Sequence, residues 1–205
     1  MKLKSYYDIV HNFEAGCDEV GRGCLAGPVV AAAVILPKSF YHPRLTDSKK
    51  VSPKERKYLE EVIKRESVAW AIGSCNEHEI GELNILRASF KAMHRALNKL
   101  AQKPDFILVD GNKFDPYAQL KHACVIKGDS KYLSIAAASI LAKEYRDDLM
   151  RNLSQEFPHY GWEKNVGYPT KQHRAAIKQH GITRHHRKSF RLLPNQMEVF
   201  KTEFD

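Results

Sequence analysis

Short apolar segments separated by polar turns dominate the first two thirds of the chain. Residues 28–36 (PVVAAAVIL) form a continuous apolar run bounded by proline at both ends, which is typical of a buried strand. Three later segments have a similar character, and residues 13–17 provide an apolar entry into a polar turn. The pattern predicts strands at 28–36, 68–74, 106–109 and 123–126.

Helix signals alternate with these strands. Ser52-Pro53-Lys54-Glu55 has the form of a capping box with proline at the first helical position, which predicts a helix to about Glu66. Asn84 suits the N-cap of the next helix. Its apolar side chains recur at helical spacing and predict one buried face, made of Leu86, Phe90, Met93, Leu97 and Leu100.

Two further helices follow in the last third of the chain. We expect a long helix from about Lys131 to Leu153, in which the three alanines at 136–138 would allow close packing on a sheet. Thr170 can cap a last helix that ends at Gly181, a natural residue after a helix C-terminus.

Strands that alternate with helices predict an α/β fold with a mixed central sheet flanked by helices. No break in composition requires a second independent domain. We expect residues 1–157 to form the core, and residues 158–205 to form a helical, basic appendage of the same compact unit, packed beside the sheet.

Composition excludes several classes of protein. The 205 residues are 43% hydrophobic, without a low-complexity tract, which disfavours disorder. No apolar run approaches the roughly 18–20 residues that a membrane span needs, and the N-terminus has no secretory signal. The four cysteines form no C-x-x-C pair, so free thiols in a reducing cytoplasm are expected. In the absence of a coiled-coil or domain-swap signal, a monomer is the default.

The positive charge is concentrated near the C-terminus. With 33 Lys and Arg against 24 Asp and Glu, the formal charge is +9. The segment from Lys164 to Arg191 contains eight of these basic residues, four histidines and no acid, with Tyr168 and Phe190 interleaved. Two interpretations remain open: a solvated basic face, or a surface that follows nucleic-acid phosphates and binds less tightly as salt rises.

Four acids lie where folding alone does not require them. Asp18 and Glu19 precede a Gly-Arg-Gly turn, Asp110 closes a predicted strand, and Asp129 stands between a strand and a helix. Asp110 before glycine is also typical of a turn, and Asp129 could cap the following helix. Two adjacent carboxylates are harder to explain in an ordinary loop.

Carboxylates beside a basic surface favour metal-dependent phosphodiester cleavage. Oxygen ligands suit Mg²⁺ or Mn²⁺, and two such ions about 3.5–4 Å apart can activate water and stabilise the leaving oxygen. Neighbours in a strand point to opposite faces, so Asp18 and Glu19 can share one site only if the backbone twists there, or if Glu19 contributes through its carbonyl group or from the side of the second metal.

The chain resembles the type 2 ribonucleases H. The similarity covers about residues 16–194 and occurs in the family's order. Eight segments carry it: DEVGRGCLAGPVV at 18–30, LTDSKK at 45–50, NILRAS at 84–89, VDG at 109–111, KGDSK at 127–131, residues 134–146, GYPT at 167–170 and HRKSF at 186–190. Val20 and Cys24 stand where alanine and proline are more usual.

The resemblance implies a ribonuclease H-like fold with a helical C-terminal region. It also implies cleavage of the RNA strand of RNA–DNA hybrids and at single ribonucleotides in duplex DNA. It implies two Mn²⁺ or Mg²⁺ ions on the family's acidic positions when substrate is bound, and substrate recognition by its glycine-arginine-glycine turn and junction-sensing tyrosine. In this sequence these positions are Asp18, Glu19, Asp110 and Asp129, then Gly21, Arg22, Gly23 and Tyr168.

Other assignments stay open at this point. Ser48 and Lys49 could hold a phosphate or belong to a solvated loop, and capping is favoured for Asn84. A non-catalytic hybrid-binding protein is an alternative that leaves the carboxylates unexplained. A related ribonuclease H that needs longer ribonucleotide stretches is another. No histidine is assigned to a metal.

Overall fold

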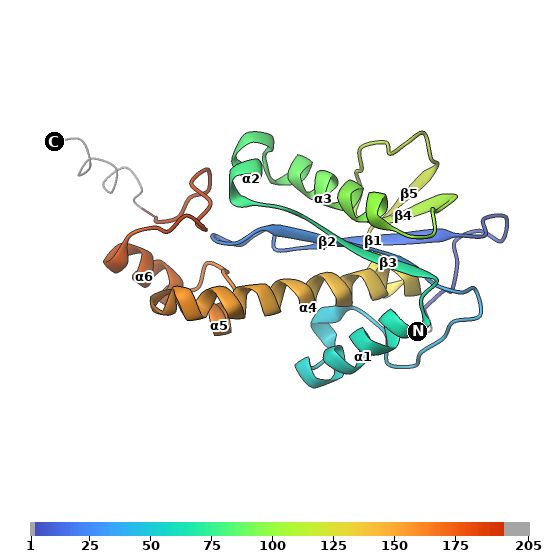
Figure 1. The fold of residues 1–205 in the computed structure, drawn as a ribbon, viewed down its shortest axis with the longest axis horizontal. Helices are drawn as coiled ribbons and strands as arrows, with labels where there is room; N and C mark the ends of the chain where they lie inside the picture. Colours follow the sequence, from blue (N-terminus) through green and yellow to red (C-terminus); the bar gives the residue numbers. More distant parts are fainter. Residues whose placement is uncertain (1–2, 195–205) are drawn as a thin grey trace.

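A computed structural model describes residues 3–194, and its centre is a five-stranded mixed sheet (Figure 1). The strand order is β3-β2-β1-β4-β5. β1 pairs antiparallel with β2 and parallel with β4; β2–β3 is antiparallel and β4–β5 parallel. The expected mixed sheet is therefore confirmed. The strands are β1 (Glu14–Val20), β2 (Val29–Ile35), β3 (Ala69–Cys75), β4 (Phe106–Asp110) and β5 (His122–Val125).

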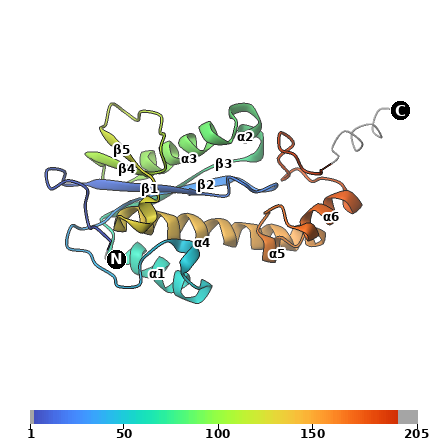
Figure 2. The same cartoon turned by 180° about the vertical axis from the view of Figure 1, so that it is seen from behind.

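Helices cover both faces of the sheet and make three layers. α2 and α3 lie on one face, and α1 and α4 lie on the other, as Figures 1 and 2 show from opposite sides. Each face has its own buried apolar cluster. The helices are α1 (Pro53–Glu66), α2 (Glu77–Leu83), α3 (Ile85–Lys99), α4 (Leu133–Glu156), α5 (Trp162–Asn165) and α6 (Lys171–His180).

The two central strands explain why the sequence reads as apolar runs. Every residue of β2 is buried, because helices cover both of its faces. α4 approaches β1 closely: a Cβ atom added at Gly16 would lie 2.3 Å from the Ser134 carbonyl carbon. The alanines at 136–138 are also buried, as their expected packing on the sheet requires.

Local capping confirms some predictions and corrects others. The Ser52 hydroxyl accepts from the Glu55 N–H at 3.3 Å, but the Glu55 carboxylate binds Arg44 instead of completing a capping box. Asn84 caps α3 through two backbone N–H groups. The capping role considered for Asp129 is wrong, because α4 begins after Tyr132 and has no side-chain cap.

α2 was not expected from the sequence. It contains seven residues and has a complete capping box between Asn76 and Glu79. Ile80 is its one buried residue, so it lacks the apolar periodicity that marks the longer helices.

The C-terminal elements gather at the C-terminal end of α4 rather than alongside the sheet (Figure 1). A third apolar cluster, which includes Met150, Trp162 and Ile177, joins them to α4. The interpretation of the segment from Lys164 to Arg191 as one basic surface needs correction, because Arg187, His173 and His186 are buried. The sequence also leaves open an interaction tail at Met197–Asp205, which lies outside the described residues. No helix in the described part of the chain is long and apolar enough to cross a membrane.

Candidate active site

The parallel pairing of β1 and β4 brings the first three acids together. Cys17 pairs with Val109, so Asp18 on β1 follows at the same edge of the sheet as Asp110, the last residue of β4. Carboxyl ends of parallel strands meet at one edge, which is where open α/β sheets bind ligands.

The fourth acid arrives through the segment after β5. A 3₁₀ turn at Gly128–Ser130 carries Asp129, which is buried. The Gly128 N–H donates to the Asp110 carboxylate at 2.7 Å and so ties this turn to the end of β4. The chain thus delivers acids from three separate segments to one place.

One cavity of about 250 Å³ is lined by all four acids. Asp18 and Glu19 both line it although they are neighbours on β1, just before the Gly21–Gly23 turn. The Glu19 N–H donates to the Asp18 carboxylate at 2.7 Å. The full lining is Asp18, Glu19, Val20, Gly21, Arg22, Gly23, Ser48, Lys49, Asp110, Asp129, Ser139, Lys143 and Tyr168.

Burial and neighbouring charges raise the pKa values of three of these acids, Asp18, Glu19 and Asp129. Burial, followed by the charges of Glu19 and Asp110, raises the pKa of Asp18 well above its usual value. Burial also raises the pKa of Glu19, against the opposing effect of Arg22, whose guanidinium lies 3.0 Å away. The pKa of Asp129 is raised by burial and by Asp47 and Asp110. A bound cation would relieve this repulsion.

The donor set fits hard divalent cations. Carboxylate oxygens are the ligands that Mg²⁺ and Mn²⁺ prefer, and Mg²⁺ commonly takes one or two of them together with water and substrate phosphate. Within residues 3–194, no group of three or more His, Cys, Asp or Glu side chains is arranged to hold a metal by itself.

The residues expected to bind substrate form the rim of the same cavity. Ser48 is buried, and its hydroxyl lies 2.9 Å from the Ser139 hydroxyl, whereas Lys49 is exposed. Tyr168 is 38% exposed, which leaves its ring accessible to a ligand. The Gly21–Gly23 turn completes the rim, with Arg22 and Gly23 exposed.

Comparison with known proteins agrees with this geometry. The model of the ribonuclease HII family matches residues 15–193. The chain belongs to the ribonuclease HII family. A relative, ribonuclease HII of Bacteroides fragilis, is 61% identical over 188 residues, which cover 91% of this chain and 94% of that protein.

Solved structures of the family share the fold. Ribonuclease H2 of Pyrococcus horikoshii matches with a TM-score of 0.78 at 25% identity, over 93% of this chain and 99% of that one. The ribonuclease HII of Archaeoglobus fulgidus, solved in complex with PCNA, matches with a TM-score of 0.72 at 26% identity, over 87% and 95%. The ribonuclease H-like fold expected from the sequence is confirmed.

Membership establishes the class of reaction. Ribonuclease HII is a ribonuclease H, a hydrolase that acts on RNA paired with DNA, and the family depends on metal ions. The chain is accordingly an enzyme rather than a non-catalytic binding module.

Two residues of the candidate site were missed by sequence reasoning. Ser139 and Lys143 both line the cavity and lie one turn apart on α4. The Lys143 ammonium lies 2.6 Å from Asp147, the next residue on the same helix face, so in sequence it is indistinguishable from an ordinary surface ion pair. The spacing of Ser139 and Lys143, together with the nearby acids, is the signal that could have found them.

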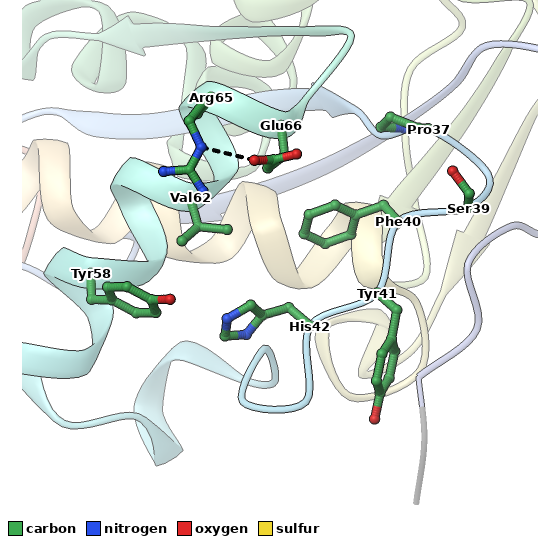
Figure 3. Close-up of a pocket in the computed structure, with 9 residues that line it drawn as sticks. All are labelled: Pro37, Ser39, Phe40, Tyr41, His42, Tyr58, Val62, Arg65 and Glu66. Carbon is green, nitrogen blue, oxygen red and sulfur yellow. Dashed lines mark hydrogen bonds and ion pairs between the residues drawn. The ribbon is translucent and has the colours of Figure 1, made fainter.

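A larger cavity elsewhere has different chemistry. It measures about 380 Å³ between the loop at 37–42 and α1, and Figure 3 shows its aromatic lining of Phe40, Tyr41, His42 and Tyr58. Its one carboxylate, Glu66, is bonded to Arg65 at 2.8 Å. It shares no lining residue with the carboxylate cavity, so chemistry rather than size selects the candidate active site.

Proposed function

We propose that the chain is an endonuclease that hydrolyses the RNA strand of RNA–DNA hybrids and also cuts at single ribonucleotides in duplex DNA. The products carry 5′-phosphate and 3′-hydroxyl ends, and two divalent ions, Mn²⁺ or Mg²⁺, take part. The observation that carries this proposal is the single cavity lined by Asp18, Glu19, Asp110 and Asp129 and rimmed by the Gly21–Gly23 turn and Tyr168.

The acids divide the cavity between them. Asp18 and Asp110 lie at adjacent strand ends and would hold ions jointly, with Glu19 and Asp129 as further ligands on either side. Divalent ions bound there supply an activated water and stabilise charge on the leaving oxygen. Burial keeps Asp18 and Asp129 in fixed positions, so their oxygens need little rearrangement when substrate arrives.

The rim suits recognition of a ribose. The 2′-hydroxyl distinguishes RNA from DNA at one nucleotide, and backbone groups of the Gly21–Gly23 turn can approach it at Gly23, where the space that a Cβ atom would occupy is open. Tyr168 would stack on the sugar that follows the ribonucleotide, with its hydroxyl near the 2′-oxygen. Correct fit at this junction would then place the scissile phosphate among the acids.

Positive side chains would hold the phosphates. Lys49 and Lys143 line the cavity and can offset phosphate charge near the cut. The exposed basic residues of the C-terminal region, which include Lys164, Lys171 and Lys188, can follow the DNA strand. The substrate of the proposal is therefore hybrid duplex or DNA that contains ribonucleotides.

Three labelled duplexes test the proposal: a long hybrid, a DNA duplex with one ribonucleotide, and an all-DNA duplex. We expect cleavage of the first two in Mn²⁺ or Mg²⁺, none in EDTA, and none of the third. Cleavage of the long hybrid alone would support a related ribonuclease H that needs longer ribonucleotide stretches. Binding without cleavage in either metal would refute the nuclease assignment.

A further inference from the structure

A fully buried arginine connects the two parts of the proposed recognition rim. Arg146 lies on α4 and has no exposed surface. Its Nε donates to the Pro28 carbonyl at 2.9 Å and its Nη2 to the Ala26 carbonyl at 2.9 Å. Its Nη1 donates to the Val166 carbonyl at 2.7 Å. One guanidinium thus spans two chain segments that are more than 130 residues apart in sequence.

These two segments carry the Gly21–Gly23 turn and Tyr168. Ala26 and Pro28 follow the turn directly, and Val166 precedes Tyr168 by two residues. The turn also rests on the arginine itself. A Cβ atom added at Gly21 would lie 2.2 Å from Arg146 Nε, and Gly21 has a φ of +90°. Glycine is therefore required at 21 by both backbone conformation and space.

Backbone contacts close the same junction. The Leu25 N–H donates to the Gly167 carbonyl at 2.8 Å, and the Gly27 N–H donates to the His185 carbonyl at 2.9 Å. A second buried arginine, Arg187, donates to the carbonyls of Arg22 at 3.0 Å and Gly27 at 2.9 Å. The turn is consequently held from two sides by guanidinium groups.

The charge of this pair has no carboxylate partner. Among residues 3–194, neither Arg146 nor Arg187 forms an ion pair, and Arg187 Nη2 is buried without a hydrogen-bond acceptor. Burying a charge without a carboxylate partner is costly, even though the Arg187 guanidinium also lies 5.1 Å from the centre of the Phe190 ring, and stability by itself would favour an apolar side chain at such a position. The arrangement instead provides rigid geometry beside the carboxylate cavity, whose lining includes Gly21, Arg22 and Tyr168.

We propose that Arg146 is a positioning residue for substrate discrimination: it fixes the Gly21–Gly23 turn relative to Tyr168, so that both meet one ribonucleotide at the same time. This inference rests on the proposed function, because it assigns discrimination to those two elements. Lysine cannot replace Arg146 in this role, because one ammonium on a flexible stem cannot hold three carbonyls in the fixed plane of a guanidinium.

Two measurements on Arg146→Lys test the proposal. The first is kcat/KM on the single-ribonucleotide duplex and on a long hybrid. We expect a loss of about 10²-fold on the single-ribonucleotide duplex, the size that a small misplacement produces, and a much smaller loss on the hybrid, which offers many registers. The second is amide hydrogen exchange at Leu25, which should accelerate while exchange within β1 stays unchanged.

Arg151→Lys is the matched control. Arg151 lies on the same helix, is exposed, and pairs with Asp148, so both measurements should equal those of the unmodified protein. Should Arg146→Lys fail to fold, Arg146→Gln, which keeps two N–H donors without the charge, takes its place. In the unmodified protein the Leu25 amide must exchange slowly, and fast exchange there overturns the proposal without any variant.

Equal losses on both duplexes would also overturn the proposal, because they would show that Arg146 serves only the fold or the chemistry. If the ratio of kcat/KM on the two duplexes is unchanged while Leu25 exchange accelerates, the junction moves without affecting discrimination. That result also overturns the proposal. Failure of the unmodified protein to cut a single ribonucleotide is a different result: it refutes the proposed function, while Leu25 exchange still reports whether Arg146 holds the junction.

Discussion

The carboxylate cavity and the C-terminal region, residues 158–194, differ in how their buried polar groups are paired. In the cavity, like charges face one another, and burial with mutual repulsion raises the pKa values of Asp18, Glu19 and Asp129. In the C-terminal region, the buried His173, His186 and Arg187 form hydrogen bonds within the chain. Under the proposed function a bound cation would offset the repulsion in the first region, whereas the buried groups of the second are nearly all paired within the chain.

The histidine pair of the C-terminal region, His173 and His186, shows how fully the buried polar groups of this region are hydrogen-bonded. The Thr183 N–H donates to His186 Nδ1 at 2.9 Å, which assigns the ring proton of His186 to Nε2, 3.2 Å from His173 Nε2. His173 Nε2 also accepts from the Trp162 indole at 3.0 Å, and its Nδ1–H donates to the Tyr168 carbonyl at 3.0 Å. Each ring nitrogen thus has a partner, and the network supports Tyr168 from behind.

Asp18→Asn should have the largest effect on cleavage, and it tests the part of the comparison that concerns the carboxylate cavity. It removes a charged oxygen ligand, so we expect a loss of at least about 10³-fold in cleavage rate, equivalent to about 4 kcal/mol. Hybrid binding should change little. Without metal, the free energy of unfolding should rise by about 1 kcal/mol or more, because a buried charge beside two others is gone. A variant that cleaves at the unmodified rate, or that is less stable, would contradict this.

Divalent cations should stabilise the unmodified protein next most strongly. Binding of Mn²⁺ or Mg²⁺ to the folded chain alone raises the free energy of unfolding by about 2.7 kcal/mol at a hundredfold excess over Kd. Thermal unfolding with and without metal measures this. The increase should disappear in Asp18→Asn and persist in Asp115→Asn, an exposed carboxylate away from the cavity. An equal increase in both variants would place the bound ion elsewhere.

Tyr168→Ala should sharpen the comparison by removing the ring that links the two regions. Loss of stacking costs about 1–3 kcal/mol, expressed in kcat/KM on the duplex with one ribonucleotide. A long hybrid should be affected less, and Tyr168→Phe should fall between the unmodified protein and Tyr168→Ala. Equal losses on both substrates would remove the sensing role of Tyr168.

The histidine pair should have the smallest effect at neutral pH and a clear one in acid. Burial, followed by neighbouring His173 and His185, lowers the pKa of His186 from 6.5 to about 3. Between these values the unfolded chain binds a proton that the folded chain does not, so the free energy of unfolding falls as pH drops from about 6.5 toward 3. Denaturant titrations should show a flatter slope for His186→Gln; an identical slope would rule out this source of acid sensitivity.

The acids of the cavity should respond to pH with the opposite sign. Their folded pKa values are raised, so the folded chain binds protons more readily than the unfolded chain does. Their repulsion therefore removes stability as pH rises above about 4. The pH dependence of Asp18→Asn, compared with that of the unmodified protein, isolates this contribution.

Much of this architecture follows from local sequence signals. The apolar run of β2 predicts burial on both faces, and Ser52 and Asn84 identify the starts of two helices. Acids after apolar segments predict the candidate site, because a strand places its last residue at the edge of the sheet. These features depend on neighbours in the chain, which is why sequence alone reveals them.

Features that depend on distant contacts were not predictable in the same way. That β1 lies beside β4 requires the strand order, and this pairing is what joins Asp18 to Asp110. Arg187 belongs to a basic segment, where exposure is the usual expectation. In the structure it is buried and donates to the Gly27 carbonyl in a distant segment. In the sequence, Lys143 and Asp147 look like an ordinary surface ion pair on a helix. Only the fold shows that Lys143 lines the cavity.

Anomalous diffraction from crystals containing Mn²⁺ and a duplex with one ribonucleotide tests the central claim most directly. The account predicts Mn²⁺ peaks inside the cavity, bonded to oxygens of Asp18, Glu19, Asp110 and Asp129 and to the phosphate on the ribonucleotide's side. Peaks bonded to other residues, or a cavity that binds the duplex without Mn²⁺, would contradict it.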